Sequence, residues 1–164
     1  MKKTVVSCCL LILALGACKK VQNQEYAGVD GDYVNGTPLP PRQEGVSFLS
    51  DSVQKGQFAP ILFGFDRAEV SPNERPKVQE IASFMRRENR NVILAGFTDE
   101  RGTEEYNRAL GERRAQAVRS ALSQEGVSPA RLQTVSFGLE MPADPAHGEN
   151  AWAKNRRVEV GVVR

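Results

Sequence analysis

An arginine in the middle of an apolar helical stripe is the feature that most constrains how this chain folds. Residues 96–115 predict the end of a strand, a tight acidic turn and an amphipathic helix. With about 3.6 residues per turn, one face of that helix carries Asn107, Leu110, Arg114, Ala117, Val118 and Ala121. This face should pack against a sheet, so the guanidinium of Arg114 is expected to be buried and to need a partner.

Two partners for Arg114 are consistent with this pattern. The turn returns the start of the helix towards the end of the strand, which brings Asp99 near Arg114. A carboxylate of a bound ligand is the second candidate, and both can act together. An aspartate–arginine pair between a strand end and a helix also stabilises many folds without any ligand. The spacing alone therefore leaves a structural role and a binding role open.

Strand and helix patterns alternate in the second part of the chain. Strands are predicted within residues 60–66, 91–97, 133–137 and 157–163. A first helix is expected to begin with the capping-box pattern of residues 71–74 and to bury Val78, Ile81, Ala82 and Met85. Further helices are expected over 106–122, with a C-cap at Gly126, and over 150–155. This order predicts an α/β fold, a two-layer sandwich with helices packed on one face of a mixed four-stranded sheet.

The first 17 residues have the parts of a bacterial lipoprotein signal peptide. Two lysines precede the apolar run 5–15, which is shorter than the about 20 residues that a membrane-spanning helix needs. The sequence Leu-Gly-Ala-Cys at 15–18 resembles a lipobox, in which Cys18 is lipidated and becomes the new N-terminus. The other two cysteines lie inside the signal, so Cys18 has no partner for a disulfide in the mature chain. An ordinary signal peptide followed by a chance cysteine is the alternative.

Residues 18–57 are predicted to be the lipidated N-terminus and a flexible tether, and residues 58–164 the folded domain. The tether is rich in Gly, Pro, Gln, Asn and Ser and has no sustained apolar period. Within it, Val46, Phe48 and Leu49 are candidates for a short segment that packs on the domain. Of the 22 lysines and arginines, two lie in the signal, which leaves 20 basic against 20 acidic residues. This balance argues against a nucleic-acid-binding protein.

Catalytic, metal-binding and cofactor-binding patterns are missing from the sequence. His147 is the only histidine and lies in a loop rich in proline and glycine. No Gly-x-Ser-x-Gly elbow, zinc-ligand cluster, P-loop or dinucleotide fingerprint occurs. Asp99 with Glu100 or Glu104 could serve as the carboxylate pair of a hydrolase, but acids at a helix N-terminus more often interact with the helix dipole. We therefore expect a protein that is not an enzyme and needs no metal or cofactor.

The central motif resembles that of a known family. Its positions are Thr98-Asp99, Gly102, Tyr106-Asn107, Leu110 and Arg113-Arg114-Ala115. Together they are similar to the signature of the OmpA C-terminal-like domain, the peptidoglycan-binding module of Gram-negative envelopes. The resemblance implies the OmpA-like form of the two-layer sandwich over residues 58–164. Among the members of the family, the chain most resembles the lipoproteins, also in residues 147–159.

The resemblance also implies a ligand and a set of contacts. The ligand is the diaminopimelate side chain of the peptidoglycan stem peptide, with Arg114 as the cation for its carboxylates and Asp99 as the anion for its amine. Further contacts are implied for Phe65, Asp66, Asn107, Leu110 and Arg157. At residue 97 the related lipoproteins more commonly have histidine. Phe97 is expected either to stack at the site or to fill the end of the strand.

The implied role is that of an outer-membrane lipoprotein on the periplasmic face, anchored by the lipid on Cys18 and holding peptidoglycan without a covalent bond. Lys19, in place of the aspartate that retains lipoproteins in the inner membrane, favours the outer membrane. Tol proteins are the implied partners, in envelope integrity and cell division. Two alternatives remain: an OmpA-family lipoprotein without Tol partners, and a protein-interaction module of the same fold that has lost peptidoglycan binding.

Overall fold

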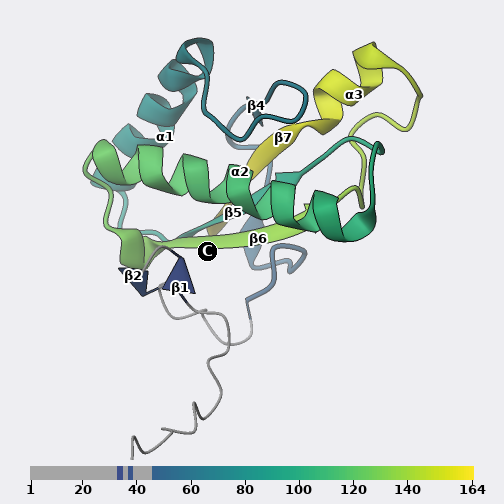
Figure 1. Cartoon of the computed structure of the whole chain (residues 1–164). Helices are drawn as coiled ribbons and strands as arrows, with labels where there is room; N and C mark the ends of the chain where they lie inside the picture. Colours follow the sequence, from purple (N-terminus) through teal and green to yellow (C-terminus); the bar gives the residue numbers. More distant parts are fainter. Residues whose placement is uncertain (1–32, 35–36, 39–45) are drawn as a thin grey trace, which may run out of the picture. The chain divides into compact units, whose positions relative to one another are not determined.

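The computed structural model describes residues 33–34, 37–38 and 46–164 (Figure 1). Its elements are β1 (Tyr33–Val34), β2 (Thr37–Pro38), β3 (Val53–Gln54), β4 (Ile61–Leu62), α1 (Arg75–Arg87), β5 (Val92–Phe97), α2 (Glu104–Gln124), β6 (Leu132–Gly138), α3 (Glu149–Asn155) and β7 (Arg157–Val163). β1 and β2 form an antiparallel pair of their own. The expected signal peptide 1–17, Cys18 and most of the expected tether lie outside the described residues.

The remaining strands form one mixed sheet in the order β3-β7-β5-β6, with β4 also paired to β7. β5 and β6 are parallel, and β7 is antiparallel to β3, β4 and β5. α1 and α2 cover the same face of this sheet (Figure 1). The predicted α/β sandwich on a mixed sheet is therefore confirmed, with β3 as a short strand beyond the four expected. No helix among the described residues is both long and apolar enough to cross a membrane.

The sheet is buried on both faces at its centre. All six residues of β5 are buried, and they alternate between two apolar clusters. Val92 and Leu94 pack under α1 and α2. Ile93, Ala95 and Phe97 face the other way and form the second cluster, together with residues that precede β4.

Residues before the expected start at 58 pack on the second face of the sheet, as suggested for Val46 and Phe48, whereas Leu49 is exposed. Phe48 and Val53 are only 3% and 4% exposed, and β3 pairs with the end of β7. The ring of Phe48 lies 6.5 Å from that of Phe97 and 5.8 Å from that of Phe137. Residues 46–57 thus belong to the folded domain because they cover the second face of the sheet. A two-residue strand shows no alternation that a sequence pattern could reveal.

The starts of the two long helices differ from expectation. The residues that α1 buries are those predicted, but the capping box is wrong, because Ser71 makes no side-chain cap. Glu74 instead accepts hydrogen bonds from the backbone N–H of Leu62, at 2.9 Å, and from Lys77 Nζ, at 2.7 Å. A 3₁₀ turn, Pro72–Glu74, precedes α1. α2 begins two residues early at Glu104, because the hydroxyl of Thr103 accepts from the backbone N–H of Tyr106.

The end of α2 is as predicted. Gly126 has φ +88°, the left-handed conformation that glycine adopts readily at a helix end. Its N–H donates to the carbonyl of Ser123, and the N–H of Val127 donates to that of Leu122. This is a Schellman motif, which satisfies carbonyl groups that would otherwise lack partners.

Candidate binding pocket

A concave pocket lies where three segments meet: the loop after β4, the turn from β5 to α2, and the first turns of α2. It is lined by Phe65, Asp66, Thr98, Asp99, Arg101, Gly102, Tyr106, Asn107, Leu110 and Arg114. Six of the seven residues expected at a binding site are therefore brought together: Phe65, Asp66, Asp99, Asn107, Leu110 and Arg114. Arg157 is not among them. The expectation missed four further lining residues, although all of them lie within or between the positions of the central motif: Thr98, Arg101, Gly102 and Tyr106.

Arg114 is completely buried in the wall of this pocket. Its Nε donates to the carbonyl of Arg67 at 2.8 Å, and its Nη1 to that of Phe97 at 2.9 Å. Nη2 donates to the carbonyl of Gly64 at 3.2 Å. Burial lowers the pKa of Arg114 to about 10, so the group remains a cation at neutral pH.

The expected ion pair between Arg114 and Asp99 is not formed. Among the described residues, no carboxylate forms a salt bridge with Arg114, whose hydrogen-bond partners are all backbone carbonyls. The loop after β4 comes close enough for the carbonyls of Gly64 and Arg67 to reach the guanidinium, a long-range contact that spacing around Asp99 could not show. The dipoles of three backbone carbonyl groups thus stabilise the guanidinium of Arg114, and no carboxylate among the described residues neutralises its charge through a salt bridge.

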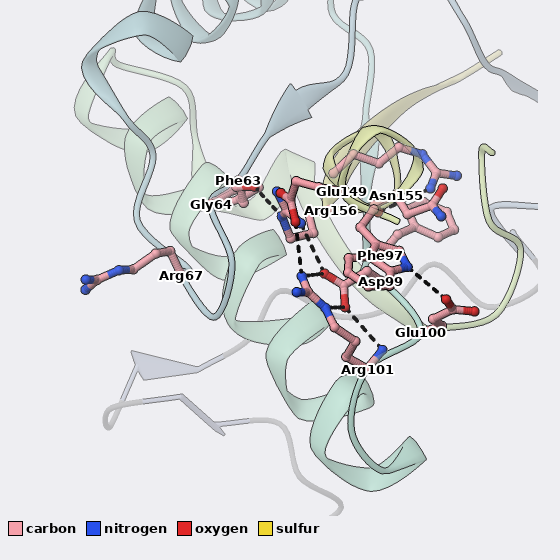
Figure 2. A network of polar contacts seen from close by, with 12 residues as sticks. Phe63, Gly64, Arg67, Phe97, Asp99, Glu100, Arg101, Glu149, Asn155 and Arg156 are labelled. Carbon is pink, nitrogen blue, oxygen red and sulfur yellow. Dashed lines mark hydrogen bonds and ion pairs between the residues drawn. The ribbon is translucent and has the colours of Figure 1, made fainter. Parts of the chain in front are cut away.

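Asp99 pairs instead with two other arginines (Figure 2). Arg101 donates from Nε to Oδ1 at 3.0 Å and from Nη2 to Oδ2 at 2.7 Å, a two-point contact. Arg156 adds a bond from Nη1 to Oδ2 at 3.3 Å. Burial raises the pKa of Asp99, but the hydrogen bonds from the two arginines outweigh it and hold the pKa below its ordinary value. Asp99 is therefore an anion under all physiological conditions.

Neither arginine lines the pocket, but Arg156, and not the expected Arg157, donates a hydrogen bond to the pocket residue Asp99. Its Nε donates to the carbonyl of Phe63 at 3.0 Å, next to the bond to Asp99 (Figure 2). Arg157 pairs with Glu159 at 2.5 Å and lies over the ring of Phe97, with Cζ 3.9 Å from its centroid. Arg156 is the C-cap of α3, and Arg157 is the first residue of β7. The side chain of Arg157 lies on the other face of the sheet, against Phe97.

Phe97 fills the end of the strand on that other face. Its ring stacks on Phe137 with centroids 5.3 Å apart and an interplanar angle of 10°. It is 1% exposed and does not line the pocket. Of the two roles expected for Phe97, the structure supports the second, in which the ring fills the end of the strand within the core.

Further polar groups line the wall and the rim of the pocket. The hydroxyl of Tyr106 donates to Asp66, and this bond raises the pKa of Tyr106. Asn107, which is 1% exposed, donates from Nδ2 to the carbonyl of Arg101 at 2.9 Å and so fixes the acidic turn. Gly102 has φ +100° in that turn, a conformation that disfavours any residue with a side chain. The hydroxyl of Thr98 is buried in the wall and has no hydrogen-bond partner among the described residues.

Comparison with known proteins gives consistent matches. Residues 62–156 match the profile of the OmpA family. The chain is 44% identical over 112 residues to the peptidoglycan-associated lipoprotein of Pseudomonas aeruginosa, which covers 68% of this chain and 67% of that protein. It is 34% identical over 149 residues to the protein of the same name from Agrobacterium fabrum, covering 90% and 80%. The crystal structure of the peptidoglycan-associated lipoprotein from Burkholderia pseudomallei superimposes with a TM-score of 0.61 at 41% identity, covering 63% and 88%.

Proposed function

The chain belongs to the OmpA family, and from that membership we propose that it is an outer-membrane lipoprotein that holds peptidoglycan without a covalent bond. Its relatives from Pseudomonas, Agrobacterium and Burkholderia carry the name peptidoglycan-associated lipoprotein. The proposed role is to tether the outer membrane to the cell wall by binding and not by catalysis.

The observation that carries this proposal is the buried cation of Arg114. A buried charge without a counter-ion is costly unless hydrogen bonds or a ligand compensate it. Arg114 lines the pocket, and within residues 46–164 none of its hydrogen bonds goes to a carboxylate. A ligand carboxylate would supply the missing negative charge, and the unpaired hydroxyl of Thr98 in the same wall offers a further polar contact.

The proposed ligand is the diaminopimelate side chain of the stem peptide, which carries both carboxylate and amine. Asp99 and Asp66 line the same pocket and supply negative charge for the amine. Phe65, Asn107 and Leu110 complete its walls. Hydrogen bonds to charged groups contribute roughly 1.5–3 kcal/mol each, so a few of them give modest affinity at one site. Firm retention would come from the lipid anchor and the polymeric wall acting together.

The membrane attachment is proposed to be a lipid on Cys18, on the periplasmic face of the outer membrane. The signal-like segment before Cys18 and the names of the relatives support this attachment. The mass of the N-terminal peptide of the mature protein tests it directly. An unmodified Cys18 would rule out the lipid anchor.

Tol proteins are the proposed partners, in envelope integrity and cell division. The support is the similarity to the lipoproteins named above, and co-purification after crosslinking in the native bacterium is the test. If no Tol protein is recovered while peptidoglycan is, the chain is a family lipoprotein without Tol partners.

Sedimentation with insoluble diaminopimelate-type peptidoglycan tests the binding itself. The detergent-solubilised protein is expected to pellet, whereas Asp99→Ala and Arg114→Ala should stay in solution. The matched control is Arg119→Ala, which removes another buried arginine of α2 that does not line the pocket. Circular dichroism verifies folding of each variant. If the folded native protein does not pellet, the protein-interaction module becomes the better description.

A further inference from the structure

Arg101 lines the pocket and also contacts a residue outside it, Trp152 of α3. Its side chain is 31% exposed, whereas that of its partner Asp99 is 5% exposed. Nε and Nη2 donate to Asp99, but Nη1 makes no hydrogen bond to any residue in 46–164. A partly exposed arginine loses rotamer freedom when it is fixed in a complex, so contacts that hold it beforehand favour binding.

Two aromatic rings hold this guanidinium. Its Cζ lies over the ring of Phe65 at 3.9 Å from the centroid and over that of Trp152 at 4.1 Å. Both distances are well inside the range of about 6 Å at which a cation is attracted to an aromatic face. Phe65 comes from the loop after β4 and Trp152 from α3, so segments far apart in the sequence meet at Arg101.

Trp152 is itself fixed from outside the pocket. Its Nε1 donates to Glu100 at 2.8 Å, and Glu100 also contacts His147 Nδ1 at 2.7 Å. Trp152 does not line the pocket, whereas Phe65 and Arg101 do. α3 adds Glu149, whose Oε2 lies 3.8 Å from Arg101 Nη2.

We propose that Trp152 is a positioning residue for ligand binding: supported by Glu100, its indole holds the guanidinium of Arg101 on Asp99, with Nη1 left to donate to an anionic group of the ligand. This inference rests on the proposed function, because it assumes that the ligand binds in this pocket. In this proposal Trp152 of α3 influences the affinity of the pocket for its ligand, although no residue of α3 lines the pocket.

A double-mutant cycle on the detergent-solubilised protein tests this role. The probe is a soluble disaccharide-tetrapeptide muropeptide that contains diaminopimelate, and calorimetry measures its dissociation constant. Trp152→Ala is expected to weaken binding about fivefold. In the Arg101→Ala background the same change should have no further effect. Trp152→Phe keeps a ring over Arg101 and should recover part of the loss.

The support from Glu100 is tested by a matched pair of variants. Glu100→Gln weakens the acceptor of the indole N–H and should reduce affinity about twofold. Glu140→Gln changes another exposed glutamate that pairs with Arg108, away from the pocket, and should leave affinity unchanged. Equal effects of the two variants would contradict the role of Glu100.

Three outcomes overturn the proposal: Trp152→Ala without effect, an equal loss in both backgrounds, or tighter binding, which would mean that Arg101 competes with the ligand. A second measurement does not depend on the ligand. The ¹⁵N–¹H heteronuclear NOE of Arg101 Nε should be high in the native protein and low in Trp152→Ala, with the backbone NOEs unchanged. If the native protein binds no muropeptide, the proposed function fails, and this NOE alone decides whether Trp152 orders Arg101.

Discussion

Gly96 of β5 and Gly111 of α2 lie in direct backbone contact. A Cβ on Gly96 would lie 2.0 Å from the carbonyl oxygen of Gly111, and one on Gly111 would lie 2.3 Å from Ser136 Oγ. Because neither residue has a side chain, α2 rests directly on β5 and β6. This close approach brings the first turns of α2 to the end of β5, where the pocket is formed.

Gly96→Ala is expected to lower the free energy of unfolding by about 3 kcal/mol, because the new methyl group meets backbone that has little room to move. Urea unfolding followed by circular dichroism measures the loss. Gly64→Ala is the control, since its Cβ would only meet the flexible side chain of Arg67 at 3.3 Å. A Gly96→Ala variant as stable as the control would contradict the direct contact.

Phe97→Leu is expected to reduce stability by about 1–2 kcal/mol and to leave peptidoglycan binding unchanged. The loss arises from the contacts of the ring with Phe137 and with the guanidinium of Arg157. Binding is spared because Phe97 faces away from the pocket. Urea unfolding and peptidoglycan sedimentation measure the two quantities. A folded variant that no longer pellets would show that Phe97 contributes to the site.

Arg156 and Arg157 form a natural matched pair, since they are adjacent and each is 5% exposed. Arg156→Gln is expected to weaken peptidoglycan binding about tenfold, because it removes a charged donor from Asp99. Arg157→Gln should change the affinity by less than about twofold, since its contacts lie on the other face of the sheet. Sedimentation at graded peptidoglycan concentrations gives both values. Equal losses would place both arginines at the site.

Acid is expected to destabilise the protein partly through Asp99. Its pKa is lower in the folded state than its ordinary value of 3.8, so folding favours the carboxylate. The resulting stability is complete above the unfolded pKa and is lost as the pH falls through the folded pKa. The free energy of unfolding should therefore decline below about pH 4, and Asp99→Asn should show a shallower decline. Asp51→Asn, which removes an exposed carboxylate outside the pocket, is the matched control.

Most regular elements could be predicted because each has a local pattern. The buried residues of α1 repeat at helical spacing, and the predicted strand 157–163 matches β7. β3 could not be predicted, because two residues carry no period. Residues 46–57 are in the fold because Phe48 meets Phe97 and Phe137, which lie far along the chain.

The sequence predicted most of the residues that line the pocket, but it did not predict which of them pair with each other. Asp99, Asn107, Leu110 and Arg114 belong to one continuous motif, and the structure confirms that they line one pocket. The expected partner of Arg114 was wrong, because the competing acceptors are backbone carbonyls of the loop after β4.

The sequence by itself determined the order of strands and helices, the burial of Arg114 and the position of the acidic turn, because each follows from residues within one or two helical turns of each other. Only the tertiary structure decided that Asp99 pairs with Arg156 and not with Arg114, that Arg157 faces away, and that Trp152 reaches Arg101. These contacts join segments separated by about half the domain. Their geometry depends on the pairing of β7 with β5, which brings Arg156 at the end of α3 to Asp99 and which no local pattern encodes.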